Sequence, residues 1–567
     1  MTFMQQKMGS RLLLTILLPL LFGACQPNAN EEQPLSITQD VVAAASFIQA
    51  SDIRADVVEL SSDAYEGRGP GTEGDRKTQT YLISRLKEMG LQPGATDNSW
   101  RQEFELIALN AQQPDTWKFN TPNGLQTYQE GTDFVVAAGK QAATATLEQA
   151  QLVFVGYGIQ APEYDWDDYK GVDVSGKVLV MMNNDPDWDP DLFGGEMRMY
   201  YGRWTYKYEI AAKLGAAGVI IIHTDPSAGY PWQVVETSWT GPQSELPNEG
   251  EPTIEIKGWM SNTSTAALFA SAGQNLDSLR QQASSKKFQP LELPITTDLT
   301  LPITMTSNTS ANILARIGGG DLADEVIVFT AHHDHLGKGV ATTPGEDVIY
   351  NGALDNATGV ASVLAIGRAF SQLPSQSRRS LLFAFVGAEE QGLLGSQYLA
   401  QHPPVAPGKL AAAINMDGAQ IHGRSLDISY VGYGRSTVDQ AAQMAADLQG
   451  RVIKGDQDPS KGYFYRSDHF SLAKIGVPSL NFEGGEDLRN GGIEAGRAFG
   501  EIYTNQHYHQ ASDEITDEWK FDGMVEDAQF GFYTAWSLAN QSALPAWYPG
   551  DEFEAARLAA IKASAEP

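Results

Sequence analysis

The chain has 567 residues, with 39 Lys and Arg against 70 Asp and Glu, and a single cysteine. The resulting net charge of −31 repels phosphate backbones and argues against nucleic acid as a partner. A hydrophobic fraction of 42% excludes a disordered acidic polymer, and the length allows several domains.

The amino-terminal residues have the pattern of a targeting segment. A short charged region precedes an apolar run over residues 12–22, which is too short to span a bilayer. The small residues before Cys25 resemble the cleavage box of bacterial lipoproteins, which implies that residues 1–24 are a signal peptide and that Cys25 carries a lipid. The alternative is an ordinary secretory signal that leaves Cys25 as a free thiol. By analogy with lipoprotein sorting, Gln26 favours an outer membrane, with the protein facing the periplasm.

Residues 25–44 are predicted to form a flexible tether, because they begin with a run rich in Asn, Glu, Gln and Pro. The next stretch contains a glycine-rich segment at residues 66–74, followed by a helix-like pattern over residues 77–89. A phosphate-binding loop is the alternative interpretation of these glycines, but the P-loop lysine is missing and no clear strand precedes them. We therefore expect a turn that leads into a helix.

The sequence pattern changes over residues 140–295. Short apolar runs predict buried strands at residues 152–155, 178–182 and 219–222. The stretch resembles a protease-associated domain, a small β-rich module inserted in or beside peptidase domains, and the resemblance implies a role in substrate access. It rests on residues 154–159, 169–177 and 212–222. Alternating aspartates at 185–191 have part of the spacing of a calcium loop, but interrupting prolines favour a solvated acidic loop.

Residues 296–545 alternate strand-like and helical segments, the pattern of an α/β sheet with crossover helices. Three apolar runs of strand length end in polar residues, at His332, at the pair 389–390 and at Asp417. Ligands bind at the carboxyl ends of strands in open α/β sheets, so these residues predict one converging site. Asp355 at the start of a helix and His509 in the loop before the last helix join it.

This set of residue types suits metal chemistry. Carboxylates and imidazoles without cysteine suit Zn²⁺, and an additional bridging carboxylate suits a pair of metals. Paired metals polarise a carbonyl and activate water at neutral pH. Such a site also needs a carboxylate that is not a ligand, to move protons. The doublet Glu389-Glu390 supplies one carboxylate of each kind.

Five segments resemble the motifs of metallopeptidase family 28, a family of co-catalytic zinc exopeptidases that includes bacterial aminopeptidases and the glutamate carboxypeptidase group. They are T-A-H-H-D-H-L-G (330–337), G-A-L-D-N-A-T-G (352–359), V-G-A-E-E-Q-G-L-L-G-S (386–396), I-N-M-D-G (414–418) and Y-H-Q-A-S-D (508–513). The resemblance covers most of the mature chain. It implies a mixed, largely parallel central sheet with helices on both faces, a smaller β-rich inserted domain and two Zn²⁺ ions per chain.

The resemblance also assigns the metal ligands. It implies that His332 and Asp417 bind one zinc ion. Glu390 and His509 would bind the other zinc ion, and Asp355 would bridge the two ions.

Two further carboxylates receive roles in the chemistry. Glu389 would be the general base that activates the attacking water and then protonates the leaving amine. Asp334 would hydrogen-bond the ring of His332 and orient it. Leu354 stands where many family members have a second acidic residue, which we expect to affect tuning rather than metal binding.

Other polar residues near these motifs receive weaker assignments. The histidines that flank the predicted ligands are expected to be neighbours only: His333, His335 and His507. A segment that resembles the lining of the family's cleft offers candidates for substrate contact or for support of the ligands, against the alternative of a structural loop: Arg466, Asp468 and His469. Tyr503 and Tyr465 are candidate donors to the oxyanion of the tetrahedral intermediate.

We therefore predict a lipid-anchored, two-zinc aminopeptidase that acts on peptides. The alternative is a carboxypeptidase of the glutamate carboxypeptidase type, because Arg466 could face a substrate carboxylate. Glutaminyl cyclisation and an inactive receptor are more distant alternatives, because every ligand position and the base are present. The predicted parts are a signal peptide (1–24), a tether (25–44), a first peptidase part (45–139), a protease-associated domain (140–295), a catalytic part (296–545) and a C-terminal tail (546–567).

Overall fold

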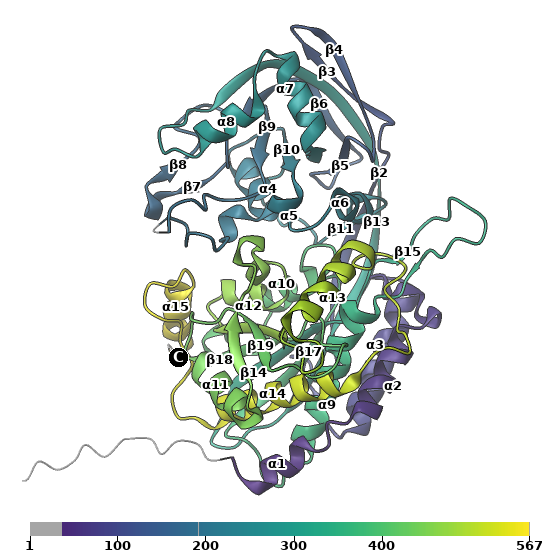
Figure 1. The fold of residues 1–567 in the computed structure, drawn as a ribbon, viewed down its shortest axis with the longest axis vertical. Coiled ribbons are helices and arrows are strands. Elements are labelled where there is room, and N and C mark those ends of the chain that lie inside the picture. The colour runs from purple at the N-terminus through teal and green to yellow at the C-terminus, as the bar shows by residue number, and fades with distance from the viewer. Residues whose placement is uncertain (1–36, 191, 566–567) are drawn as a thin grey trace, which may run out of the picture. The chain divides into compact units, whose positions relative to one another are not determined.

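The computed structural model describes residues 37–190 and 192–565 (Figure 1). The predicted signal peptide, Cys25 and most of the predicted tether lie outside these residues. The end of the tether is helical instead, because α1 (Gln39–Ala45) buries Val41 and Ala44 against the core. Among the helices of the described ranges, none has both the length and the apolar character needed to cross a membrane.

A mixed sheet forms the centre of the peptidase part. Its strand order is β2–β13–β17–β14–β18–β21–β19–β20. The four middle strands, from β17 to β21, run parallel to one another, and antiparallel pairs flank them on both sides. The strands are β2 (Arg101–Ala111), β13 (Leu291–Ile317), β14 (Leu322–His332), β17 (Arg379–Val386), β18 (Leu410–Asn415), β19 (Asp427–Val431), β20 (Val452–Gly455) and β21 (Ser479–Gly484).

Helices cover both faces of this sheet. Successive apolar side chains of β14 point to opposite faces, so each face must be covered. Ile327 and Phe329 point into a core shared with the helices of one face. Val326 and Val328 point into a separate core on the opposite face. The first face carries α2 (Ala50–Leu60), α9 (Thr358–Ser371), α11 (Val438–Gln449) and α14 (Phe521–Asn540), and the second carries α10 (Leu394–Gln401) and α12 (His469–Lys474). The predicted α/β class with a largely parallel centre is confirmed.

A second sheet forms an inserted domain, defined here as residues 116–302. Its strand order is β4–β3–β13–β6–β9–β10–β12–β5. The strands are β3 (Thr116–Thr121), β4 (Gly124–Gln129), β5 (Phe134–Ala138), β6 (Thr144–Phe154), β9 (Val178–Met182), β10 (Gly218–His223) and β12 (Ile256–Ser261), and the helices include α4 (Trp204–Lys213), α6 (Trp232–Trp239), α7 (Asn262–Ser271) and α8 (Leu276–Ala283).

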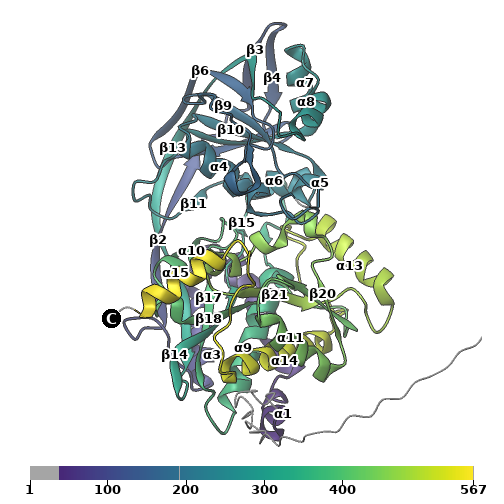
Figure 2. The same cartoon turned by 90° about the vertical axis from the view of Figure 1, so that its left-hand side faces the viewer.

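The long strand β13 belongs to both sheets. Its first half pairs with β3 and β6, and residues 303–313 pair with β2, which lies beside it in both views (Figures 1 and 2). The second sheet therefore begins with β3, well before the predicted boundary at residue 140. Within it, Asp185 is buried and accepts a hydrogen bond from the backbone of Met199, unlike the solvated loop that the sequence suggested.

Two other segments show how the ends of the domain are fixed. The glycine-rich stretch leads into α3 (Glu73–Glu88), as predicted, and the Thr72 side chain caps this helix. The predicted C-terminal tail forms α15 (Glu554–Ala565), which packs onto the domain. Its buried Arg557 donates to the backbone oxygens of Leu410 and Pro545.

Candidate metal centre

The predicted strand ends meet at one edge of the central sheet. His332 is the last residue of β14, and Asp417 lies two residues after β18. The pair Glu389-Glu390 follows β17 in a tight turn. Gly395 packs against this turn so closely that a Cβ on Gly395 would lie 2.2 Å from the backbone oxygen of Gly387. Because these strands are parallel, their carboxyl ends carry the polar side chains to the same place.

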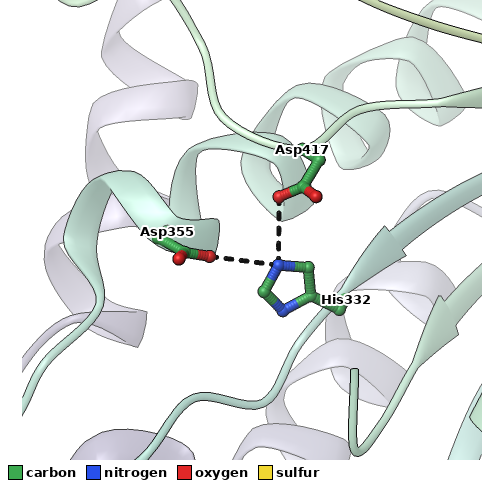
Figure 3. Close-up of side chains that lie close together, drawn as sticks. All are labelled: His332, Asp355 and Asp417. Carbon is green, nitrogen blue, oxygen red and sulfur yellow. Dashed lines mark hydrogen bonds and ion pairs between the residues drawn. The ribbon is translucent and has the colours of Figure 1, made fainter. Parts of the chain in front are cut away.

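The first group of ligand atoms surrounds His332. Its Nε2 lies 3.1 Å from Oδ1 of Asp355 and 3.1 Å from Oδ1 of Asp417 (Figure 3). One ligand atom from each of these three residues lies within 4.8 Å of the others, so the group could hold a metal ion. The side chain of His332 is only 1% exposed, which fixes its direction.

The second group surrounds Glu390. Nε2 of His509 lies 3.0 Å from Oε2 of Glu390 and 3.5 Å from Oδ2 of Asp355. Asp355 therefore offers one oxygen to each group, which is the arrangement predicted for a bridging carboxylate. His335 also contacts Glu390, with Nδ1 2.5 Å from Oε1, so it is more than the neighbour that the sequence suggested.

The protonation of these groups tests whether they fit a metal. Burial lowers the pKa of His332, but the nearby carboxylates, Asp417 first, outweigh burial and raise it well above its ordinary value. Burial likewise lowers the pKa of His509, yet Glu390 and Asp355 raise it to about 10. The raised pKa values favour the protonated rings, whose positive charge balances that of the carboxylates. A divalent cation would replace these protons, because imidazole nitrogens and carboxylate oxygens are its usual ligands, and the residues therefore fit a metal.

Glu389 and Asp334 lie beside this centre. Burial raises the pKa of the Glu389 carboxyl well above its usual value, and the carboxylates of Asp417 and Glu390 add to this shift. The Asp334 carboxylate accepts a hydrogen bond from the backbone N–H of Glu389 at 3.1 Å. The carboxylate lies 3.8 Å from Nδ1 of His332, beyond hydrogen-bond distance, but the backbone oxygen of Asp334 lies 3.3 Å from the same nitrogen, so Asp334 contacts the ring through its backbone. The Asp334 carboxylate holds the backbone that presents Glu389.

Of the remaining predicted residues, Asp468 and Tyr503 lie near the centre, and the others have partners elsewhere. Asp468 is buried near the centre, and burial raises its pKa to about 7. The Tyr503 hydroxyl donates to Asp513 at 3.2 Å. His469 packs edge-on against Phe464, away from the ligands. Three others have partners elsewhere: Arg466 donates to the backbone oxygen of Ala228, His333 contacts Asp75, and Tyr465 donates to Glu552. His507, predicted to be a neighbour, contacts Ser512.

Three residues that sequence reasoning missed hold the ligand-bearing loops in place. Arg68 is 1% exposed, and among the described residues its guanidinium donates to backbone oxygens alone: those of His333, Leu60, Asn351 and Gly352. Asn356 joins the Asp355 segment to the Asp417 segment, because its oxygen accepts from Gly418 and its nitrogen donates to the carbonyl of Met416. Asp513 accepts from the backbone N–H groups of Leu354 and Asp355. Asn356 and Asp513 lie inside the recognised motifs, and Arg68 lies in the glycine-rich stretch.

Comparison with known proteins identifies the domain that carries this centre. Residues 312–530 match the model of peptidase family M28. The chain carries a peptidase domain of family M28. The matched span begins in β13, ends in α14 and contains every predicted metal ligand and the predicted base.

Several proteins are similar to this chain. Leupeptin-inactivating enzyme 1 from Streptomyces exfoliatus is 26% identical over 255 residues, which are 44% of this chain and 53% of the relative. A protein named probable leucine aminopeptidase 2 from Aspergillus oryzae is 25% identical over 366 residues, 61% of this chain and 64% of the relative. The chain thus spans about half the length of the first of these relatives.

The likeness to a solved structure extends over most of the chain. The solved structure of an aminopeptidase from Aneurinibacillus sp. strain AM-1 superposes with a TM-score of 0.50 at 19% identity. The superposition covers 89% of this chain and 97% of that structure. The two proteins therefore share a fold.

Proposed function

We propose that this M28 protein is a zinc-dependent aminopeptidase, which removes residues from the free amino end of peptides. The observation that carries the proposal is the pair of ligand groups linked by Asp355, at the carboxyl ends of parallel strands in an M28 domain. The relative named as a probable leucine aminopeptidase supports cleavage from the amino end of the peptide. Arg466, which kept the carboxypeptidase alternative open, is engaged by Ala228 and stacks over the ring of Tyr230 at 5.4 Å.

Two zinc ions per chain would be held by the groups described above. His332 and Asp417 would hold one ion, Glu390 and His509 the other, and Asp355 would contact both. When bound, zinc supplies a Lewis acid for the scissile carbonyl and lowers the pKa of water towards neutrality.

The protein's own residues would move the proton. Glu389 would accept the proton of the attacking water and pass it to the leaving amine. Its raised pKa keeps the carboxyl able to hold that proton, and nearby cations would lower the pKa enough for the base to form. Asp334 would keep Glu389 in place through the backbone hydrogen bond at 3.1 Å.

A panel of short peptides tests the direction of attack. The zinc-loaded protein should cleave unblocked and carboxy-amidated dipeptides and leave amino-acetylated dipeptides intact. The reverse pattern would establish a carboxypeptidase, and cleavage of none of them by protein with bound zinc would contradict the proposed function.

On sequence grounds, we also propose where the protein is located and what kind of domain the inserted domain is. The cleavage-box pattern before Cys25 supports a lipid anchor in a bacterial outer membrane, with the enzyme facing the periplasm. The motifs at residues 154–159, 169–177 and 212–222 support a protease-associated domain that shapes access to the centre. Replacement of Cys25 by Ala should move the protein from the membrane fraction to the soluble one, and a variant that stays with the membrane would contradict the anchor.

A further inference from the structure

Helix α6 of the inserted domain contacts a predicted metal ligand. The Ser238 hydroxyl oxygen lies 3.1 Å from Nδ1 of His509, although the two residues are 271 positions apart in the chain. On the other side of the same ring, Nε2 lies 3.0 Å from Glu390 and 3.5 Å from Asp355. His509 is therefore held between a hydroxyl of the inserted domain and the carboxylates of the centre.

The inserted domain fixes the position of Ser238 firmly. At the start of α6, the indole nitrogen of Trp232 donates to the backbone oxygen of Gly131 at 2.6 Å. At its end, the Trp239 ring packs edge-on against Trp259, with ring centroids 6.3 Å apart. Between these anchors, Val234 and Val235 are buried. A hydroxyl on a helix anchored at both ends has little freedom to leave the imidazole.

The inserted domain also approaches the segment that follows Glu390. The ring of Trp204, at the start of α4, packs against Trp239 with centroids 5.9 Å apart. The far edge of Trp204 lies 3.9 Å from the position that a Cβ on Gly392 would occupy. Gly392 follows Glu390 by two residues, so the inserted domain contacts the segments that carry both Glu390 and His509.

The direction of the Ser238 hydrogen bond follows from the metal position. Nε2 of His509 faces the carboxylates, so a metal would bind this nitrogen and leave the ring proton on Nδ1. The Nδ1–H group then donates to the Ser238 oxygen. Such outer partners fix the tautomer and the orientation of a ligating imidazole, and their loss typically weakens metal binding or activity by about 10- to 100-fold.

We propose that Ser238 is a positioning residue for His509, so that the inserted domain completes the metal centre in addition to covering it. The inference rests on the metal dependence of the proposed function. It predicts that loss of the Ser238 hydroxyl weakens one of the two zinc sites, the one that contains His509 and Glu390. The site that contains His332 and Asp417 should keep its affinity.

Chelator competition with zinc alone tests this proposal without any peptide. In the full-length protein, Ser238→Ala should lower the affinity of one zinc site by about 10- to 100-fold. Ser238→Thr keeps the hydroxyl and should restore the affinity. Thr237→Val removes a hydroxyl from the preceding residue of α6 and serves as the matched control, with both affinities unchanged.

Activity gives a second measurement. Ser238→Ala should lose turnover at limiting zinc and regain most of it at saturating zinc, because the defect lies in metal retention. Equal zinc affinities in Ser238→Ala and the unmodified protein, or an equal loss in Thr237→Val, would overturn the proposal. A protein that binds zinc in a Ser238-dependent way but cleaves no peptide would overturn the proposed function alone, and a protein that binds no zinc would overturn both.

Discussion

The carboxylate of Glu390 contacts two imidazole rings, one at each oxygen. Nδ1 of His335 lies 2.5 Å from Oε1, and Nε2 of His509 lies 3.0 Å from Oε2. His509 also lies 3.5 Å from Asp355, and His335 shares with Asp355 and Glu390 a group of ligand atoms within 4.8 Å of one another that could hold a metal ion. The His335 ring is pressed against Gly352, where an added Cβ would lie 2.5 Å from the ring carbon Cγ. This packing suits a side chain that holds Glu390 in place, and His509 stays the predicted ligand.

Substitution of each imidazole separates these roles. His509→Ala should remove one zinc ion, because the ligand itself is lost. His335→Ala should retain both ions, with one of them bound about 10- to 100-fold more weakly, because only the support of Glu390 is lost. Metal analysis after gel filtration measures both. Loss of an ion in His335→Ala together with full retention in His509→Ala would reverse the assignment.

Glu389→Gln should abolish turnover while both zinc ions remain bound. The amide has nearly the same shape as the carboxylate but cannot accept the proton of the attacking water, and general-base catalysis contributes about 10²- to 10⁴-fold. Steady-state kinetics and metal analysis of the same preparation check this. If zinc is lost along with activity, Glu389 is a ligand, which is a real alternative because it lies within one ligand group with His332 and Glu390.

The sequence predicted the convergence of the centre because parallel strands end at the same edge, so His332, Glu390 and Asp417 had to meet. It missed Arg68, whose partners are backbone oxygens up to 284 positions away and leave no pattern in residue types. It missed Ser238 for the same reason, since nothing in α6 marks one serine as a partner of His509. The second sheet begins before the predicted boundary at residue 140, and its first strand, β3, alternates buried and more exposed residues much as the neighbouring strand β2 does, so the sequence pattern does not change there.

Asp355→Ala should weaken both zinc sites. Its two oxygens face different imidazoles, with Oδ1 3.1 Å from His332 and Oδ2 3.5 Å from His509. Removal of a shared carboxylate therefore takes a ligand from each ion. Chelator titration should show two weakened steps, whereas Asp347→Ala, at an exposed residue of the preceding loop, should leave both steps unchanged. A variant at Asp355 that binds two zinc ions tightly would show that the bridge is misassigned.

Arg68→Met should destabilise the domain by about 1–3 kcal/mol for each buried backbone oxygen that loses its donor. The guanidinium donates to the carbonyls of His333 and Asn351, among others, and the methionine would leave these buried oxygens without a donor. Urea unfolding measures the loss. Arg76→Met on α3, where the arginine side chain is 57% exposed, should change stability by less than about 0.5 kcal/mol. Similar losses for the two variants would contradict the role of Arg68.

We expect His469 to make the free energy of unfolding sensitive to acid. Burial lowers the pKa of this imidazole to about 3, and the positive charge of Arg435 adds to the shift. In the unfolded chain the His469 ring has a pKa near 6.5, so below this pH it binds a proton that the folded protein does not bind. The free energy of unfolding therefore falls as the pH falls towards 3. Between pH 6.5 and 5.5 the loss from this residue is about 1 kcal/mol.

The measurement is urea unfolding at both pH values for the unmodified protein, His469→Gln and His402→Gln. The glutamine at 469 cannot take up a proton in the unfolded chain, so its stability should fall by about 1 kcal/mol less than that of the unmodified protein. His402 is exposed, and its replacement should leave the pH dependence as it was. An unchanged pH dependence in His469→Gln would show that the folded protein accommodates the charged ring, in conflict with its full burial beside Phe464.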